Sequence, residues 1–205
     1  MKERFEEIYN NNEWAYGSGP GSLRKNNKGY IDFLEKFIKN NNVSSVLDLG
    51  CGDWQFSKII DWTGIQYRGY DIVESVINEN NKKYSSDNIS FHIFSDSFSI
   101  LPKVDLLIVK DVLQHWSKET IDNFIPFLNK YKFSLITNCV GFDDTMNELV
   151  EDGGFSNLDL RLPPYNMKLE EVYQYTNKRP WFLPESLFKP TWIKKVLLME
   201  GKNSD

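Results

Sequence analysis

A glycine turn that directly follows an apolar strand constrains this chain more than any other feature of its sequence. Residues 46–53 read V-L-D-L-G-C-G-D, so a short strand runs into two glycines that stand one residue apart. Because Gly50 and Gly52 lack side chains, the backbone N–H groups of such a turn can approach a ligand closely. A second acid, Asp71, ends the apolar and aromatic run 65–71 and follows Gly52 by nineteen residues. An acid about 20 residues past a glycine turn is where such folds hold a ribose, so we expect a nucleoside cofactor.

The residues after the turn indicate which nucleoside cofactor fits. A dinucleotide fold prefers a third glycine, which lets helix and strand pack around a pyrophosphate. This chain has Gln55 at that position, preceded by Asp53 and Trp54. Because an acid repels a neighbouring pyrophosphate, Asp53 argues against NAD and FAD and favours a ligand with a positive charge.

The form D-L-G-C-G-D resembles the first motif of the class I S-adenosylmethionine (SAM) methyltransferases, and the resemblance runs from about Val43 to Cys139. It implies that residues 48–52 cradle the methionine part of SAM and that Asp71 binds the ribose. It also implies that Asp96, after the third strand, lies near the adenine amine. Trp54 departs from the pattern, since many relatives have a third glycine there. The residues expected to bind the cofactor are Asp48, Gly50, Cys51, Gly52, Asp53, Trp54, Asp71, Ile72, Ser95, Asp96 and Lys110.

Alternating strands and helices predict an α/β fold with a doubly wound, Rossmann-like and mostly parallel sheet of seven strands. The expected strands are 44–49, 65–71, 89–94, 104–109 and 133–137, and the last two, 171–175 and 192–198, are expected to form an antiparallel hairpin. The expected helices are 2–10, 23–39, 54–61, 73–83 and 118–129, the last with Ser117 as N-cap. In such a sheet the ligand lies beyond the carboxyl ends of the strands.

The length of 205 residues suits one α/β domain with a full core. We expect a single methyltransferase domain over residues 1–205. It divides into an N-terminal cap and lid (1–42), a SAM-binding core (43–150), and a substrate cover with the C-terminal hairpin (151–205).

Composition restricts the partners. A net charge of −5 gives the chain no overall basic character for a phosphate backbone, so nucleic acid is not expected as a substrate, although a local basic patch remains open. No apolar run reaches the length of a membrane span, and no signal segment is expected. The two cysteines, Cys51 and Cys139, form no disulfide framework, which favours a reduced, cytoplasmic location. The many Asn, Lys and Ile residues are typical of an AT-rich bacterial genome.

The residues after the fourth strand are candidates for catalysis. Asp111 and His115 are four residues apart, so they share one face of a helical turn at the carboxyl edge of the sheet. An imidazole titrates near neutral pH, so His115 is the candidate general base for removing a proton from an acceptor hydroxyl. The alternatives are that Asp111 caps the turn and that His115 packs beside Trp116.

The Asp–His spacing also resembles that of methyltransferases acting on phosphoethanolamine, in which an N-terminal tyrosine closes over the substrate. Tyr16, just before the run G-S-G-P-G-S, is the matching candidate here. Its alternative role is an aromatic anchor for a surface loop. Asn138, Asp143 and Asp144, together with Asp111, offer oxygen ligands for Mg²⁺. Loop acids are usually solvated, so we expect no metal.

The late segments are expected to select the acceptor. Arg161 and Arg179 can grip a phosphate or carboxylate bidentately, and Tyr165 and Asn138 complete the expected substrate-binding set. A packed cover loop with solvated basic ends is the alternative. With the N-terminal loop, residues 158–166 and 178–182 resemble small bacterial methyltransferases of capsule and surface-polysaccharide pathways. That resemblance implies O-methylation of a sugar, a sugar nucleotide or a phosphorylated precursor.

The leading interpretation is therefore a SAM-dependent O-methyltransferase for a small, polar and potentially anionic acceptor. N-methylation of a small amine and a non-catalytic SAM-binding partner subunit are the alternatives. The sequence leaves the acceptor atom, any requirement for a metal and the oligomeric state open.

Overall fold

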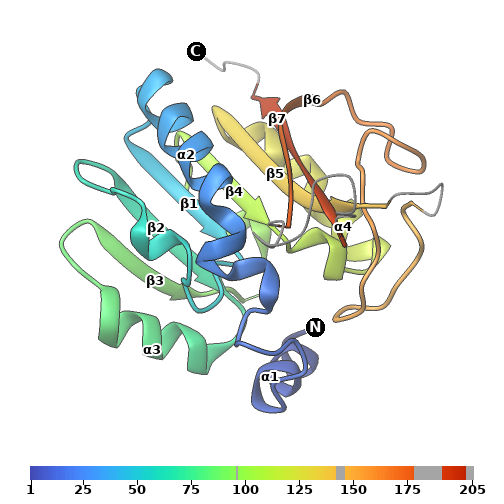
Figure 1. Ribbon diagram of the computed structural model, residues 1–205, viewed down its shortest axis with the longest axis horizontal. Helices are drawn as coiled ribbons and strands as arrows, with labels where there is room; N and C mark the ends of the chain where they lie inside the picture. Colours follow the sequence, from blue (N-terminus) through green and yellow to red (C-terminus); the bar gives the residue numbers. More distant parts are fainter. Residues whose placement is uncertain (96, 142–145, 178–190, 202–205) are drawn as a thin grey trace, which may run out of the picture.

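A computed structural model of the chain describes residues 1–95, 97–141, 146–177 and 191–201. Its centre is a seven-stranded sheet with the order β3-β2-β1-β4-β5-β7-β6 (Figure 1). The strands are β1 (Ser45–Leu49), β2 (Gln66–Asp71), β3 (Ile89–Ile93), β4 (Leu106–Lys110), β5 (Phe133–Val140), β6 (Glu170–Thr176) and β7 (Ile193–Glu200). The first five are parallel, and β7 runs antiparallel to both β5 and β6. This confirms the expected fold class, including the C-terminal hairpin.

Helices cover the sheet (Figure 1). The α-helices are α1 (Lys2–Asn10), α2 (Arg24–Asn40), α3 (Glu74–Tyr84) and α4 (Lys118–Phe124). Short 3-10 turns are η1 (Pro20–Ser22), η2 (Ser57–Ile59), η3 (Phe98–Ile100), η4 (Leu113–His115) and η5 (Ile125–Lys130). The Ser117 side chain accepts a hydrogen bond from the Thr120 N–H, as expected of the N-cap of α4.

The prediction of a helix over residues 54–61 is wrong. Only the turn η2 forms there, because Trp54 has a φ of 56°, a left-handed conformation that no α-helix accommodates. The Trp54 ring instead packs among the rings of Tyr67, Tyr84 and Phe91. The helix expected over 118–129 is also shorter: α4 ends at Phe124 and continues as η5, since Pro126 lacks the N–H that an α-helix needs.

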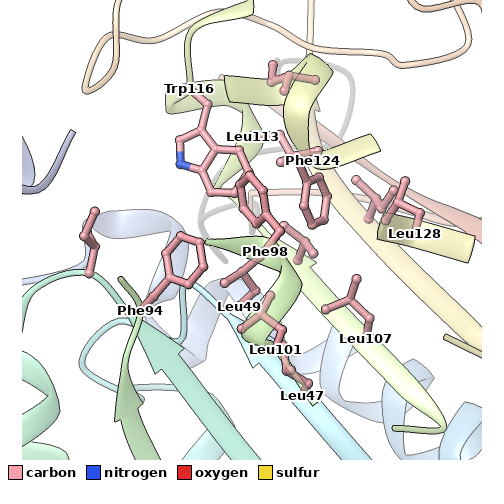
Figure 2. Packing of buried hydrophobic residues seen from close by; sticks show 14 of the residues in the cluster. Leu47, Leu49, Phe94, Phe98, Leu101, Leu107, Leu113, Trp116, Phe124 and Leu128 are labelled. Carbon is pink, nitrogen blue, oxygen red and sulfur yellow. The ribbon is translucent and has the colours of Figure 1, made fainter. Parts of the chain in front are cut away.

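Each face of the sheet carries its own apolar core. Leu107 and Val109 of β4 belong to the cluster that contains Phe124 of α4, whereas Leu106 and Ile108 belong to the cluster that contains Leu34 of α2. All five residues of β4 are buried, as expected of a parallel strand covered on both faces. Figure 2 shows the first cluster, in which aromatic rings pack over the leucines of β1 and β4: Phe98, Trp116, Phe124, Leu47, Leu49 and Leu107. No helix in the described part of the chain has the length and apolar character needed to cross a membrane.

Candidate functional site

A cavity lies where β1, β2 and β4 end, as expected for a sheet of this kind. Strand ends line one side of it, and the N-terminal segment, residues 1–22, covers the other through Met1, Phe5, Tyr9, Trp14, Ser18 and Ser22. The cavity is therefore assembled from the glycine turn, the loop after β4 and the start of the chain.

The glycine turn has the open backbone that its sequence predicts. Gly50 and Gly52 have φ angles of 75° and 53°, where a side chain is strained. A Cβ at Gly50 would collide with Val112, and one at Gly52 would collide with Ser18. The N–H of Gly50 donates to the Tyr70 carbonyl at 2.7 Å, which ties the turn to the end of β2.

Two buried carboxylates face the cavity beside this turn. Asp71 accepts the Gly52 N–H at 2.9 Å through Oδ2 and the Val73 N–H at 3.0 Å through Oδ1. Burial raises the pKa of Asp71. Asp48 accepts the Tyr67 hydroxyl at 2.6 Å, and burial raises its pKa to about 6. Acids in this position suit a cationic ligand.

The structure brings most of the expected cofactor-binding residues to the cavity. Those that line it are Asp48, Gly50, Cys51, Gly52, Asp71, Ile72 and Lys110. Burial raises the pKa of the Cys51 thiol well above its usual value, so Cys51 acts there as a small uncharged side chain. Leu49, which belongs to the expected cradle 48–52, also lines the cavity, and so does Phe94, for which the sequence carried no motif.

The other expected cofactor-binding residues lie elsewhere. Asp53 holds the N-terminal segment, because its Oδ1 accepts the Ser18 hydroxyl at 2.7 Å. Trp54 is buried in the core, and Ser95 is exposed outside the cavity lining. Asp96 lies outside the described residues.

The hydrogen bonds around His115 fix its tautomer. Its Nδ1 lies 2.7 Å from the carbonyl of Gly154, which can only accept, so Nδ1 carries the proton. The Gln114 Oε1 accepts the Cys139 N–H at 2.7 Å, which turns the amide nitrogen toward His115 Nε2 at 3.3 Å. Burial lowers the pKa of His115, so the imidazole is neutral and Nε2 keeps a lone pair. The ring packs against Trp14, with the two centroids 4.8 Å apart, rather than beside Trp116.

Asp111 joins two buried lysines instead of capping the turn after β4. Its Oδ2 accepts from Lys110 Nζ at 2.6 Å and from Lys194 Nζ of β7. Burial opposes ionisation of Asp111, but the two ammonium groups outweigh it and lower the pKa of Asp111 to about 2. Sequence reasoning missed Lys194. The sequence did carry one signal: Lys194 stands two residues before the apolar Val196 in the last strand, so both side chains lie on the same face of the sheet.

Tyr9, and not Tyr16, reaches the cavity. The Tyr16 side chain is 66% exposed, and its backbone carbonyl accepts from the Gln55 amide. Ala15 and Tyr16 both have positive φ angles, and this reversal of the chain turns the Tyr16 ring outward. Tyr9 lines the cavity and shares a 2.7 Å hydrogen bond with the Ser18 hydroxyl. Tyr9 and Trp14 were not singled out, because their spacing on and after α1 carries no motif.

Three expected substrate-binding residues that the structure describes, Asn138, Arg161 and Tyr165, do not line the cavity. The Arg161 guanidinium is held by Asp159 at 2.7 Å and by Glu171 at 3.0 Å, which leaves its donors engaged within the protein. Tyr165 packs against the core beside Lys118. Asn138 is buried, and its side-chain amide has no hydrogen-bond partner among the described residues. Arg179, Asp143 and Asp144 lie outside the described residues. Within the described ranges, no three acidic, His or Cys side chains gather as a metal site would require.

No protein-family model matches the chain, and no curated protein matches its sequence. Solved structures do match its fold. TehB from Haemophilus influenzae aligns with a TM-score of 0.59 and 21% identity, over 85% of this chain and 62% of its own, which is less than two thirds of TehB. Magnesium protoporphyrin IX methyltransferase (ChlM) from Synechocystis PCC 6803, with bound SAH, aligns with a TM-score of 0.65 and 14% identity over 98% of this chain and 100% of its own.

Human N-acetylserotonin methyltransferase (ASMT), in complex with SAM, aligns with a TM-score of 0.55 and 14% identity over 85% of this chain and 55% of its own. At these identities the likeness is one of fold. The chain therefore has the fold of these solved structures, two of which are named methyltransferases.

Proposed function

We propose that this protein is a SAM-dependent methyltransferase that acts on a hydroxyl of a small polar acceptor. One observation carries the proposal: the glycine turn, the buried acids and a neutral histidine line the same cavity. The fold likeness to structures crystallised with SAM or SAH supports it.

The cavity residues fit SAM. Gly50 and Gly52 line the cavity and would hold the methionine part, and the Asp71 carboxylate would accept the ribose hydroxyls. Asp48 and Asp71 supply negative charge beside a ligand that carries a sulfonium and an ammonium group. When bound, SAM supplies an electrophilic methyl carbon.

In this proposal His115 removes the acceptor proton. Its Nε2 bears the lone pair, and its contact with Gln114 at 3.3 Å is long enough for an acceptor hydroxyl to replace it. A base positioned in this way contributes on the order of 10²–10⁴ in rate, and alignment of the reacting atoms supplies the remainder. The Nδ1 bond to Gly154 holds the ring in the reactive tautomer.

We further propose a sugar, sugar nucleotide or phosphorylated precursor of a bacterial surface polysaccharide as the acceptor, methylated in the cytoplasm. The resemblance of the N-terminal loop and the late segments to methyltransferases of such pathways supports this assignment. Matched hydroxyl and amine acceptors, compared for their rate of methyl transfer, separate O-methylation from N-methylation.

Calorimetry with S-adenosylhomocysteine (SAH), the product of the donor, tests the proposal on the purified chain alone. We expect the wild-type protein to bind SAH and Asp71→Ala to bind it roughly tenfold or more weakly, the effect of losing a charged hydrogen-bond acceptor. Asp87→Ala, at an exposed acid between α3 and β3, is the matched control and should bind normally. Wild-type protein that fails to bind SAH would refute the proposed function.

A further inference from the structure

Two buried lysines share one carboxylate where the cavity reaches the loop after β4. Lys110 of β4 and Lys194 of β7 lie on either side of β5 and project from the same face of the sheet. Both side chains are only 3% exposed, and both ammonium groups contact Asp111 Oδ2. We call Lys110, Asp111 and Lys194 the lysine pair site.

The lysine pair site has two ammonium groups but only one carboxylate, so one positive charge is not balanced within it. Within the described ranges, neither lysine has a second carboxylate within 4.0 Å. Asp48 is the next carboxylate along the cavity and is already bonded to Tyr67. A buried charge without its own partner is costly, and burial accordingly lowers the pKa of Lys110 to about 8 against the attraction of Asp111.

Among the described residues, the other neighbours of the two ammonium groups are uncharged. Lys110 Nζ donates to the Gly21 carbonyl at 3.3 Å and lies 4.8 Å from the centroid of the Phe56 ring. Lys194 Nζ lies 4.9 Å from the centroid of the Trp192 ring. The Tyr175 hydroxyl is buried nearby and has no hydrogen-bond partner among the residues that the structure describes. Aromatic faces and one carbonyl stabilise cations only in part, so the site retains capacity for an anion.

The lysine pair site borders the same cavity as the proposed base. Lys110, Asp111 and His115 line the cavity together with Ser22, whereas Lys194 lies outside the lining and contacts Asp111. Gly21 packs against the site, because a Cβ at Gly21 would come within 2.7 Å of Lys194 Nζ. An anionic group lying under Ser22 would place the rest of a small molecule beside His115. Arg161, the cation that sequence reasoning favoured for this role, is held by Asp159 and Glu171 instead.

We infer that Lys110 and Lys194 bind an anionic group, a carboxylate or a phosphate, of the methyl acceptor. This inference rests on the proposed function and narrows it to acceptors that carry a negative charge. The same chemistry could come from a second source, the carboxylate of the bound donor, and the experiment below distinguishes the two.

The test titrates inorganic sulfate into the full-length protein, with and without saturating SAH, by calorimetry near pH 7. Sulfate keeps a constant charge across this range, so changes in affinity report on the protein. We expect Lys194→Met to weaken sulfate binding to the SAH-loaded protein roughly tenfold or more, as loss of one charged donor implies. Lys195→Met is the matched control: Lys195 is the next residue of β7, pairs with Glu171 and should leave sulfate affinity unchanged.

A second variant shifts the affinity in the opposite direction and guards against a folding artefact. Asp111→Asn removes the competing carboxylate, and asparagine tolerates the φ of 60° at this position. We expect Asp111→Asn to bind sulfate more tightly than the wild type. Weaker binding by both Lys194→Met and Asp111→Asn would contradict the charge argument.

Comparing SAH with methylthioadenosine distinguishes the two sources of the anion, the acceptor and the carboxylate of the donor. Methylthioadenosine lacks the amino-acid part of SAH, so it reports on the cavity without the donor carboxylate. If Lys194→Met weakens binding of SAH but not of methylthioadenosine, and SAH-loaded protein rejects sulfate, the donor carboxylate occupies the site and the inference is overturned. Failure of SAH to bind would instead defeat the proposed function, whereas normal SAH binding with no sulfate binding would defeat only this inference.

Discussion

The two halves of the cavity are built in different ways. The half proposed to bind the methyl donor, here the donor half, consists of residues 48–52 and Asp71 and comes from adjacent parallel strands and short sequence separations. The half proposed to bind the acceptor, here the acceptor half, consists of Asp111, His115 and Lys194, which lie as far as 83 positions apart in the sequence. The donor half is thus encoded locally, whereas the acceptor half depends on the antiparallel insertion of β7 beside β5.

The largest expected effect is on turnover, which a substitution in the acceptor half should lower without changing the affinity of the donor half for SAH. His115→Ala should lower turnover by roughly 10²–10⁴, because the acceptor loses its base, while the affinity for SAH changes little. Steady-state kinetics and calorimetry on the same sample measure both quantities. His92→Ala, at the partly exposed histidine of β3, is the control. Turnover equal to that of the wild type would remove His115 from catalysis.

A pair of glycines probes the donor half. Gly50 and Gly64 have nearly the same φ, 75° and 74°, but a Cβ at Gly50 meets Val112, whereas one at Gly64 meets nothing within 4 Å. Both alanine variants should lose about 1–2 kcal/mol from backbone strain. Gly50→Ala should lose a further ~1–3 kcal/mol from overpacking, and it alone should weaken SAH binding.

Urea unfolding and SAH titration of the two glycine variants measure these differences. Equal losses of stability in the two variants, with SAH binding intact in both, would show that the turn is not the close-packed cradle described above.

The pH dependence of kcat tests the role of His115 in the acceptor half. A general base works when it is deprotonated, so activity is present above the pKa of His115 and is lost as the pH falls through it. Because burial lowers that pKa below its usual value of about 6.5, kcat should stay flat through neutral pH and fall only in more acidic buffer. A kcat profile that begins to fall above pH 7 would contradict the buried, neutral imidazole.

The smallest expected effect is on the release of SAH and comes from the N-terminal segment, residues 1–22, which covers the cavity. Ser18 Oγ bonds to Tyr9 and to Asp53 at 2.7 Å each, which fastens the N-terminal segment over the cavity. Ser18→Ala should weaken SAH binding by about 1 kcal/mol, roughly fivefold, through faster dissociation. Stopped-flow release of SAH measures this rate, and Ser86→Ala, in the exposed turn before β3, is the control. An unchanged release rate would exclude a fastening role for Ser18.

The sequence predicts the donor half well for a physical reason. A turn with left-handed glycines and an acid at a strand tip is specified by a few neighbouring residues, so Gly50, Gly52 and Asp71 were expected where they lie. The strands also follow directly from their apolar runs. The prediction of a helix after β1 failed because the left-handed conformation of Trp54 and its ring contacts override the local sequence pattern.

The acceptor half could not be predicted in the same way. The contact of Lys194 with Asp111 depends on sheet order, and the contact of Trp14 with His115 depends on how the N-terminal segment folds back. Arg161 was expected to bind substrate from its residue type, but the structure pairs it with Asp159 two positions earlier. Charge alone, without its partners, does not identify a binding residue.

A crystal structure of the full chain soaked or grown with SAH tests the central claim most directly. We expect the nucleoside in the cavity, with the Asp71 carboxylate on the ribose hydroxyls, the amino-acid part over Gly50 to Gly52, and the sulfur directed toward His115. A cavity that stays empty at saturating SAH, or that residues 1–22 fill in place of the ligand, would contradict the account.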